Sequence, residues 1–119
     1  MNTRQTGQAG EDQAALFLIK HGYKILARNF NTPQGELDLV VRQGNALVFV
    51  EVKSRASMAF GGPLLAVTPA KQKRLALAAT QYIKANSPKF DSIRFDVVCI
   101  LPDRIEHVQN AFQPNRNTL

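Results

Sequence analysis

Two acids and a lysine in the middle of the chain have the residue types and the spacing of a hydrolytic metal site. Asp38 lies 13 residues before Glu51, and Lys53 follows Glu51 by two positions. Carboxylate oxygens are ligands that Mg²⁺ prefers, and Mg²⁺ keeps several waters when one or two carboxylates bind it. An ammonium group beside such a cation can orient or activate water, or stabilise the charge that develops on a phosphate. These residues predict metal-assisted hydrolysis of a phosphodiester if the fold brings them together.

A β-hairpin is the element that would bring the two acids together. Residues 36–43 and 46–54 both follow the period-two pattern of β-strands. Gly44-Asn45 lies between them and is a two-residue turn signal, with glycine first as a type II′ turn prefers. If this dipeptide forms the turn, Gln43 pairs with Ala46, and that pair fixes the register of the whole hairpin.

The predicted register places Asp38 directly opposite Glu51, and Glu36 directly opposite Lys53. Because side chains alternate between the faces of a strand, all four are expected on one face, with opposed β-carbons about 4.5–5.5 Å apart. Two like charges in this position destabilise a sheet, and a shared divalent cation would offset their repulsion. The alternative is an amphipathic strand with a solvated polar face, and a bulge or a different turn would separate the acids.

The rest of the sequence predicts the elements that surround this hairpin. Their order is helix, three strands, helix and one or two strands, which predicts a single α/β domain over residues 1–119, with a mixed β-sheet flanked by helices. Thr68 is the expected N-cap of the second helix and Pro69 its first residue. The expected ranges are a helix over 10–21, a strand over 23–29, a turn over 31–35, the hairpin, a loop over 56–67, a helix from 69 to 86, strands over 93–101 and 104–108, and flexible tails at 1–9 and 109–119.

Two segments carry a resemblance to a known superfamily. Gly35–Leu39, which contains Asp38, followed by Phe49–Arg55, which contains Glu51 and Lys53, resembles the PD-(D/E)XK nuclease signature. The chain is most similar to the YraN family of small bacterial proteins, which is related to archaeal Holliday-junction resolvases. The resemblance covers roughly residues 7–101, and it implies a restriction-endonuclease-like core in the order αβββαβ(β). Other segments that carry it are Gly10-Glu11, Phe60-Gly61, Lys71–Leu75 and Arg94–Val98.

The resemblance also implies roles for individual residues. Asp38 and Glu51 correspond to ligands of Mg²⁺ or Mn²⁺, with the backbone carbonyl of Val52 as a further ligand, and Lys53 corresponds to the catalytic lysine. Glu11 matches an acid of the N-terminal helix that contributes to the metal site in the junction resolvases. Leu37 stands where the signature has a proline, a departure that removes no ligand.

The charge distribution favours a polyanionic partner. The chain has 15 Lys and Arg against nine Asp and Glu, a formal net charge of +6. Seven of the basic residues lie between positions 52 and 90, a stretch without an acid. Arg55, Lys71, Lys73 and Arg74 are the candidates for contacts with nucleic-acid phosphates. The alternative is a basic face that is simply solvated.

The remaining chemistry-bearing residues indicate structure rather than catalysis. His21 and His107 have no partners at metal-ligand spacing, so each is expected to be structural or at the surface. Cys99 is expected in the core, and Asp96 is a candidate for a buried, hydrogen-bonded acid. Because a single cysteine cannot form an intramolecular disulfide, a reducing cytoplasm is expected. No apolar run approaches the roughly 20 residues that span a bilayer, and a signal peptide is not expected.

These observations together predict a Mg²⁺- or Mn²⁺-dependent endonuclease that acts on DNA, with branched or junction DNA as one substrate class. The alternative is a non-catalytic nucleic-acid-binding module with the same fold. A third hypothesis is a scaffold that binds an acidic protein partner. By analogy with the junction resolvases, whose substrate has two-fold symmetry, a homodimer is also expected.

Overall fold

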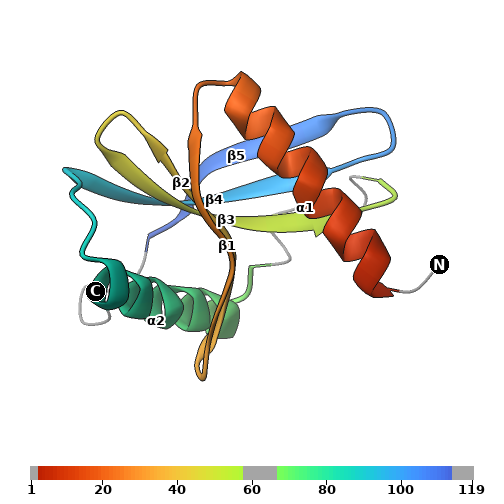
Figure 1. Cartoon of the computed structure of the whole chain (residues 1–119). Helices are drawn as coiled ribbons and strands as arrows, with labels where there is room; N and C mark the ends of the chain where they lie inside the picture. Colours follow the sequence, from red (N-terminus) through yellow and green to blue (C-terminus); the bar gives the residue numbers. More distant parts are fainter. Residues whose placement is uncertain (1–2, 58–66, 114–119) are drawn as a thin grey trace.

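A computed structural model describes residues 3–57 and 67–113, which form a five-stranded β-sheet between two helices (Figure 1). The strand order across the sheet is β1-β2-β3-β4-β5. Helix α1 lies on one face of the sheet, and α2 lies on the other (Figure 1). The elements are α1 (Thr3–Lys20), β1 (Lys24–Thr32), β2 (Gly35–Gln43), β3 (Ala46–Ser54), α2 (Pro69–Asn86), β4 (Ser92–Ile100) and β5 (Ile105–Phe112).

The sheet is mixed because one of its connections crosses over a face. β1, β2 and β3 follow one another as antiparallel neighbours. β3 and β4 are parallel, and α2 forms the crossover that a parallel pair requires. β5 then returns antiparallel to β4. The predicted fold class and the order αβββαββ are confirmed.

Each helix covers its own hydrophobic core. On the α2 side, Leu47 and Phe49 of β3 pack with Leu75 of α2, and on the α1 side, Val48 and Val50 pack with Leu18 of α1. Both faces of the central strands are therefore buried, which explains why β3 and β4 are rich in consecutive apolar residues. No helix in residues 3–57 and 67–113 is long and apolar enough to cross a membrane.

The ends of α2 follow the capping rules that its sequence predicts. Thr68 accepts a hydrogen bond from the backbone N–H of Lys71 at 3.2 Å, and Pro69 occupies the first helical position. At the other end, Ser87 adopts a left-handed conformation with φ of 47° and donates its N–H to Ile83. The predicted bounds of this helix are confirmed.

Helix α1 and strand β5 extend into the segments that the sequence predicts as tails, 1–9 and 109–119. α1 begins at Thr3 rather than at residue 10, because an isolated Gly7 costs a helix only about 1 kcal/mol and is tolerated. β5 continues to Phe112, which is buried and stacks on Phe95 with ring centroids 4.8 Å apart. As a result, Glu11 lies in the middle of α1 and not at its start.

Candidate active site

The hairpin that carries the two acids has the predicted register. Gly44 has φ of 57°, as the first position of a type II′ turn requires. The pairing of β2 with β3 runs from Gln43↔Ala46 to Leu39↔Val50 without a shift. The next residues in this register are Asp38 and Glu51.

β2 leaves β3 at Asp38, so the prediction that four charged residues share one face is wrong. The Asp38 carboxylate accepts a hydrogen bond from the backbone N–H of Val52 at 2.8 Å. Beyond this point, β2 turns over: Leu39 packs on the α1 side of the sheet, but Leu37 packs on the α2 side. The neighbouring position on β1, Asn29, has the unusual φ of 54°. The hairpin is distorted where the acids lie.

Glu36 does not lie where the sequence predicts it, because of this distortion. Its predicted partner across the hairpin is Lys53, but the pairing of β2 with β3 ends at Leu39↔Val50, and at Glu36 the register continues with Asn31 of β1. Lys53 instead forms an ion pair with Glu51, with 3.2 Å between Nζ and Oε1. Glu36 lines a separate hollow with Glu11 and Asn29. Lys53 is therefore held on the Glu51 side of the site.

Asp38, Glu51 and Lys53 converge on one open hollow of about 340 Å³. Glu11 reaches the same hollow from α1, and the backbone of Val52 and Ser54 completes its wall together with Gly7. The separation of β2 from β3 creates this space beside the ends of the paired segments. The convergence that the sequence predicts is thus present, in a hollow between two diverging strands rather than on a flat sheet face.

Glu11 reaches the hollow because α1 lies close to the end of β3. A β-carbon on Gly10 would stand only 2.8 Å from Ser54 Oγ, so the glycine permits this approach. Glu11 Oε1 is buried and has no hydrogen-bond partner within the part of the chain that the structure describes. Burial raises the pKa of Glu11, although a hydrogen bond from Asn29 opposes the rise. A buried carboxylate oxygen without a donor is costly, and a cation would satisfy it.

Asp38 is the most perturbed acid of the site. Burial is the main cause that raises its pKa, to about 7, and the negative charge of Glu51 raises it further. The hydrogen bond from Val52 acts in the opposite direction but is weaker. A carboxyl group in a hollow, with a strongly raised pKa and a second acid as neighbour, is typical of functional sites.

Glu51 is buried between two lysines. Its side chain is 7% exposed, and its Oε1 lies 2.7 Å from Lys71 Nζ and 3.2 Å from Lys53 Nζ. Burial lowers the pKa of Lys53, and the adjacent Lys71 lowers it further. Burial also acts to lower the pKa of Lys71, but its hydrogen bonds to Glu51 and Lys53 and the negative charges of Glu51 and Asp38 together outweigh this effect, and the pKa is raised.

The position of Lys71 is a feature that sequence reasoning missed. The sequence predicts it as a phosphate contact at the start of the second helix, near the loop that follows the strand of Glu51 and Lys53. In the structure, α2 follows β3 and crosses to the parallel strand β4, so the first turn of α2 begins near the carboxyl end of β3, where Glu51 and Lys53 lie. The crossover itself was the signal that could have found this contact.

The other three predicted phosphate contacts lie outside the hollow. Arg55, Lys73 and Arg74 are all exposed. Arg55 continues from β3, and its backbone N–H donates to Ile100 while its guanidinium donates to Ser54. Lys73 and Arg74 lie one turn into α2, where the backbone of Arg74 packs against Gly35 of the β1–β2 hairpin.

The donor set of the hollow fits a hard divalent cation that keeps part of its hydration shell. Among residues 3–57 and 67–113, no three His, Cys, Asp or Glu side chains are grouped closely enough to form a protein cage around an ion. Glu11, Asp38 and Glu51 thus share a hollow without forming such a cage. Mg²⁺ is commonly bound through one or two carboxylates, with waters and substrate phosphates as the other ligands. Asp38 and Glu51 supply that number, and Glu11, which has a buried oxygen without a partner, lines the same hollow.

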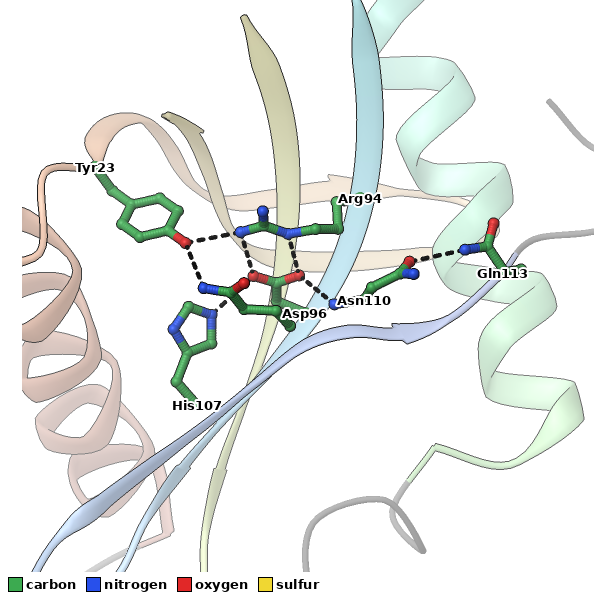
Figure 2. A network of polar contacts seen from close by, with 7 residues as sticks. Tyr23, Arg94, Asp96, His107, Asn110 and Gln113 are labelled. Carbon is green, nitrogen blue, oxygen red and sulfur yellow. Dashed lines mark hydrogen bonds and ion pairs between the residues drawn. The ribbon is translucent and has the colours of Figure 1, made fainter. Parts of the chain in front are cut away.

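A second buried acid belongs to a different network (Figure 2). Asp96 on β4 is 1% exposed, and it receives the Arg94 guanidinium at 2.8 and 2.9 Å and the Asn110 backbone N–H at 2.9 Å. His107 Nε2 lies 2.7 Å from the same carboxylate. Tyr23 accepts a further hydrogen bond from Arg94 at 2.7 Å. The predictions of a buried, hydrogen-bonded Asp96 and of a structural His107 are confirmed.

His21 and Cys99 also have the structural roles that the sequence predicts. The His21 ring stacks on Phe17 with centroids 4.1 Å apart, and its Nδ1 lies 2.7 Å from the Phe17 carbonyl. Cys99 is buried in β4, and burial raises the pKa of its thiol. The Phe60-Gly61 segment of the resemblance lies outside the described residues.

Comparison of the sequence with known proteins identifies relatives along most of the chain. Residues 10–100 match the sequence model of "Uncharacterised protein family UPF0102". A UPF0102 protein of Syntrophomonas wolfei is 50% identical over 113 residues, which covers 92% of this chain and 98% of the relative. A UPF0102 protein of Thermodesulfovibrio yellowstonii is 44% identical over 108 residues, covering 91% of this chain and 96% of the relative.

The fold is similar to that of a solved archaeal protein. The structure of Hjc from Archaeoglobus fulgidus, described as a Holliday junction resolvase, superposes with a TM-score of 0.57. The similarity covers 86% of this chain and 75% of the resolvase, at 16% sequence identity. At that identity, the similarity establishes the fold and not the activity.

Proposed function

The chain belongs to the uncharacterised protein family UPF0102, the YraN family, and we propose that it is a Mg²⁺- or Mn²⁺-dependent endonuclease that hydrolyses phosphodiester bonds of DNA. The observation that carries this proposal is the convergence of Asp38, Glu51 and Lys53 on one hollow where β2 leaves β3. The similarity of the fold to that of a Holliday junction resolvase supports it. Asp38, Glu51 and Lys53 also stand at the positions of the two acids and the lysine in the PD-(D/E)XK nuclease signature.

The acids of the hollow are the proposed cation ligands. Asp38 and Glu51 would hold the cation, and the Val52 carbonyl and Glu11 are the further donors. A bound divalent cation supplies a Lewis acid that lowers the pKa of water and neutralises phosphate charge. The hydrogen bond from Val52 to Asp38 fixes the direction of one carboxylate before any ligand binds. Pre-organised ligands of this kind avoid a reorganisation cost during the reaction.

Lys53 is the proposed catalytic lysine. Its ammonium group lies 3.2 Å from Glu51 and lines the same hollow, so it is near any phosphate that enters. From there it would stabilise the negative charge that develops on the phosphate, or hold the attacking water in place. Burial lowers the pKa of Lys53 from its ordinary value.

The basic residues around the hollow are the proposed contacts with the DNA backbone. Lys71 pairs with Glu51, an acid of the hollow, while Arg55, just past β3, and Lys73 and Arg74, on α2, are exposed. Phosphate contacts of this kind position a nucleic acid without reading its sequence. Branched or junction DNA is the proposed substrate class, and a homodimer would match the two-fold symmetry of a junction.

Cleavage assays test the proposal directly. Linear, nicked and four-way-junction DNA would be incubated with the full chain and Mg²⁺, Mn²⁺ or EDTA, alongside Asp38→Asn, Glu51→Gln and Lys53→Met. We expect cleavage with either metal, none with EDTA, and loss of cleavage in all three variants. Lys84→Met, an exposed lysine at the far end of α2, is the matched charge control and should cleave normally.

Two outcomes would contradict the proposal in different ways. Cleavage that survives both Asp38→Asn and Lys53→Met would come from a contaminant or another site. Salt-sensitive DNA binding without turnover, under every metal condition, would favour the non-catalytic binding module instead.

A further inference from the structure

We propose that Lys71 is a built-in competitor of the divalent cation: it neutralises Glu51 in the metal-free protein, and it must leave Glu51 when the cation binds. This inference rests on the proposed metal site of Asp38 and Glu51, and it assigns to Lys71 a role beyond a phosphate contact. Its basis is the ion pair between Lys71 and Glu51, with 2.7 Å between Nζ and Oε1.

The two lysines of the site hold Glu51 in different ways. Lys53 lies two residues from Glu51 on the same strand, and its Nζ is 3.2 Å from the carboxylate. Lys71 reaches the same oxygen at a shorter distance from α2, across the space between helix and sheet. Glu51 Oε1 therefore already has two ammonium partners, as many as a carboxylate oxygen has lone pairs. A cation that binds this oxygen therefore has to displace one of them.

Exposure does not separate the two lysines, whose side chains are 24% (Lys53) and 26% (Lys71) exposed, but Lys71 comes from a different element than Glu51 and is the one we expect to leave. Its backbone is fixed, since its N–H donates to the Thr68 hydroxyl at the N-cap of α2. Its side chain is long and 26% exposed, so the ammonium group can leave Glu51 for solvent without a shift of the helix. The strand position of Lys53 ties it to the same face of β3 as Glu51.

Charge balance gives the reason for the competition. Without a metal, the acids that line the hollow are Glu11, Asp38 and Glu51, and the cations that face them are Lys53 and Lys71. These charges nearly cancel. A divalent cation added between Asp38 and Glu51 would stand close to two ammonium groups, and like charges at such distances repel strongly in a partly buried site.

The same arrangement couples the cation to the substrate. Once Lys71 leaves Glu51, its ammonium group is free to pair with a DNA phosphate at the hollow. A phosphate that holds Lys71 would in turn favour the bound cation, because coupling between two ligands is reciprocal. In the metal-free protein, Lys71 is then paired with Glu51. In the protein with both metal and DNA, Lys71 is paired with the phosphate.

A direct Mn²⁺ titration, read by the electron paramagnetic resonance signal of free Mn²⁺, tests the competition without any measurement of cleavage. The full chain is compared with Lys71→Met, Lys71→Gln and Lys71→Arg. We expect Lys71→Met and Lys71→Gln to bind Mn²⁺ about tenfold more tightly than the unaltered chain, because they remove the competing charge. Lys71→Arg keeps the charge and should bind no more tightly than the unaltered chain.

Two controls assign the effect to this site. Lys84→Met removes a charge at the other end of the same helix, about 20 Å away, and should leave the Mn²⁺ affinity unchanged. Combining Lys71→Met with Asp38→Asn should abolish the gain. Circular dichroism melts in EDTA establish that each variant is folded, and the glutamine variant replaces the methionine variant if the latter does not fold.

The outcomes separate this inference from the proposed function. The unaltered chain could bind Mn²⁺ while Lys71→Met leaves the affinity unchanged or weakens it. That result would overturn the competition but retain the metal site. An equal gain in Lys84→Met would also overturn it, since the effect would then be one of net charge. If neither the unaltered chain nor any Lys71 variant binds Mn²⁺, the metal site of the proposed function fails, and the competition fails with it.

Discussion

The Val52 backbone N–H donates to the Asp38 carboxylate at 2.8 Å, at the point where the pairing of β2 with β3 ends. At the edge of the hollow, the Asp38 carboxylate therefore accepts a hydrogen bond of β3 where the backbone pairing of the two strands has ended. Asp96 does the same on β4, where it accepts the backbone N–H of Asn110. The surroundings of the two acids differ: Asp96 is paired with Arg94, whereas Asp38 faces the negative charge of Glu51.

The first prediction concerns Asp38→Asn and stability. Because burial and Glu51 raise the pKa of Asp38 to about 7, the folded protein holds this proton more tightly than the unfolded chain, whose aspartates have a pKa of about 3.9. The metal-free protein should lose stability as pH rises from about 4 to about 7. Asparagine keeps an acceptor for Val52 but carries no charge, so Asp38→Asn should be more stable at pH 8, by on the order of 2 kcal/mol.

Urea unfolding in EDTA at pH 5 and pH 8 measures this difference. The gain of Asp38→Asn should be small at pH 5 and largest at pH 8. A variant that is less stable than the unaltered chain at pH 8 would show that Asp38 is not under electrostatic strain. An acid whose negative charge destabilises the fold, and whose neutralisation removes activity, is typical of a functional site.

The second prediction concerns Lys53→Met. We expect a fall in the cleavage rate by a factor of about 10² to 10⁴, the usual contribution of one group that transfers a proton or stabilises charge. DNA binding should remain within a few-fold of normal, because the exposed phosphate contacts lie elsewhere. Single-turnover cleavage and fluorescence anisotropy separate the two effects. Equal losses of rate and affinity would assign Lys53 to binding alone.

The local features of this fold could be predicted from the sequence, because each is set by neighbouring residues. The Gly44-Asn45 turn and the alternation of the flanking strands fix the register of β2 with β3. Thr68 and Pro69 fix the start of α2. The hairpin register brings Asp38 and Glu51 near each other, but it does not predict that the pairing ends at Leu39↔Val50, just before the acids.

The missed features depend on contacts between elements that are distant in the sequence. Leu37 moves to the α2 side because β2 leaves β3 and stays paired with β1, which no pattern within the hairpin reveals. Lys71 reaches Glu51 through the crossover of α2. β5 extends to Phe112 because that ring stacks on Phe95. In each case, tertiary packing decides the outcome.

The third prediction concerns the network around Asp96. Burial alone raises the pKa of Asp96, but hydrogen bonds from His107, Arg94 and Asn110 outweigh it, so the pKa lies below its usual value. A lowered pKa contributes stability above the unfolded value of about 3.9, and that contribution is lost as pH falls through the folded pKa. Asp96→Asn should therefore cost about 2–4 kcal/mol at pH 7, because it leaves Arg94 without its charged partner.

Chemical denaturation at pH 7 and at pH 3 checks this prediction. The difference between the unaltered chain and Asp96→Asn should be smaller at pH 3 than at pH 7, because the unfolded chain takes up the proton below its pKa of about 3.9. A double variant, Arg94→Met with Asp96→Asn, removes both charges and should recover part of the loss at pH 7. An Asp96→Asn chain of normal stability at pH 7 would contradict the structural role of the network.

The fourth prediction concerns the exposed basic residues beside the hollow. If Lys73 and Arg74 contact DNA phosphates, each releases about one counterion on binding, so Lys73→Ala and Arg74→Ala should each lower the salt slope by about 0.9. Fluorescence anisotropy over a range of KCl concentrations gives the slope as the gradient of log K against log salt. Lys84→Ala, near the end of the same helix, should leave it unchanged. An equal fall of the salt slope in all three variants would mean that DNA binding depends on the net charge of the chain and not on specific contacts with Lys73 and Arg74.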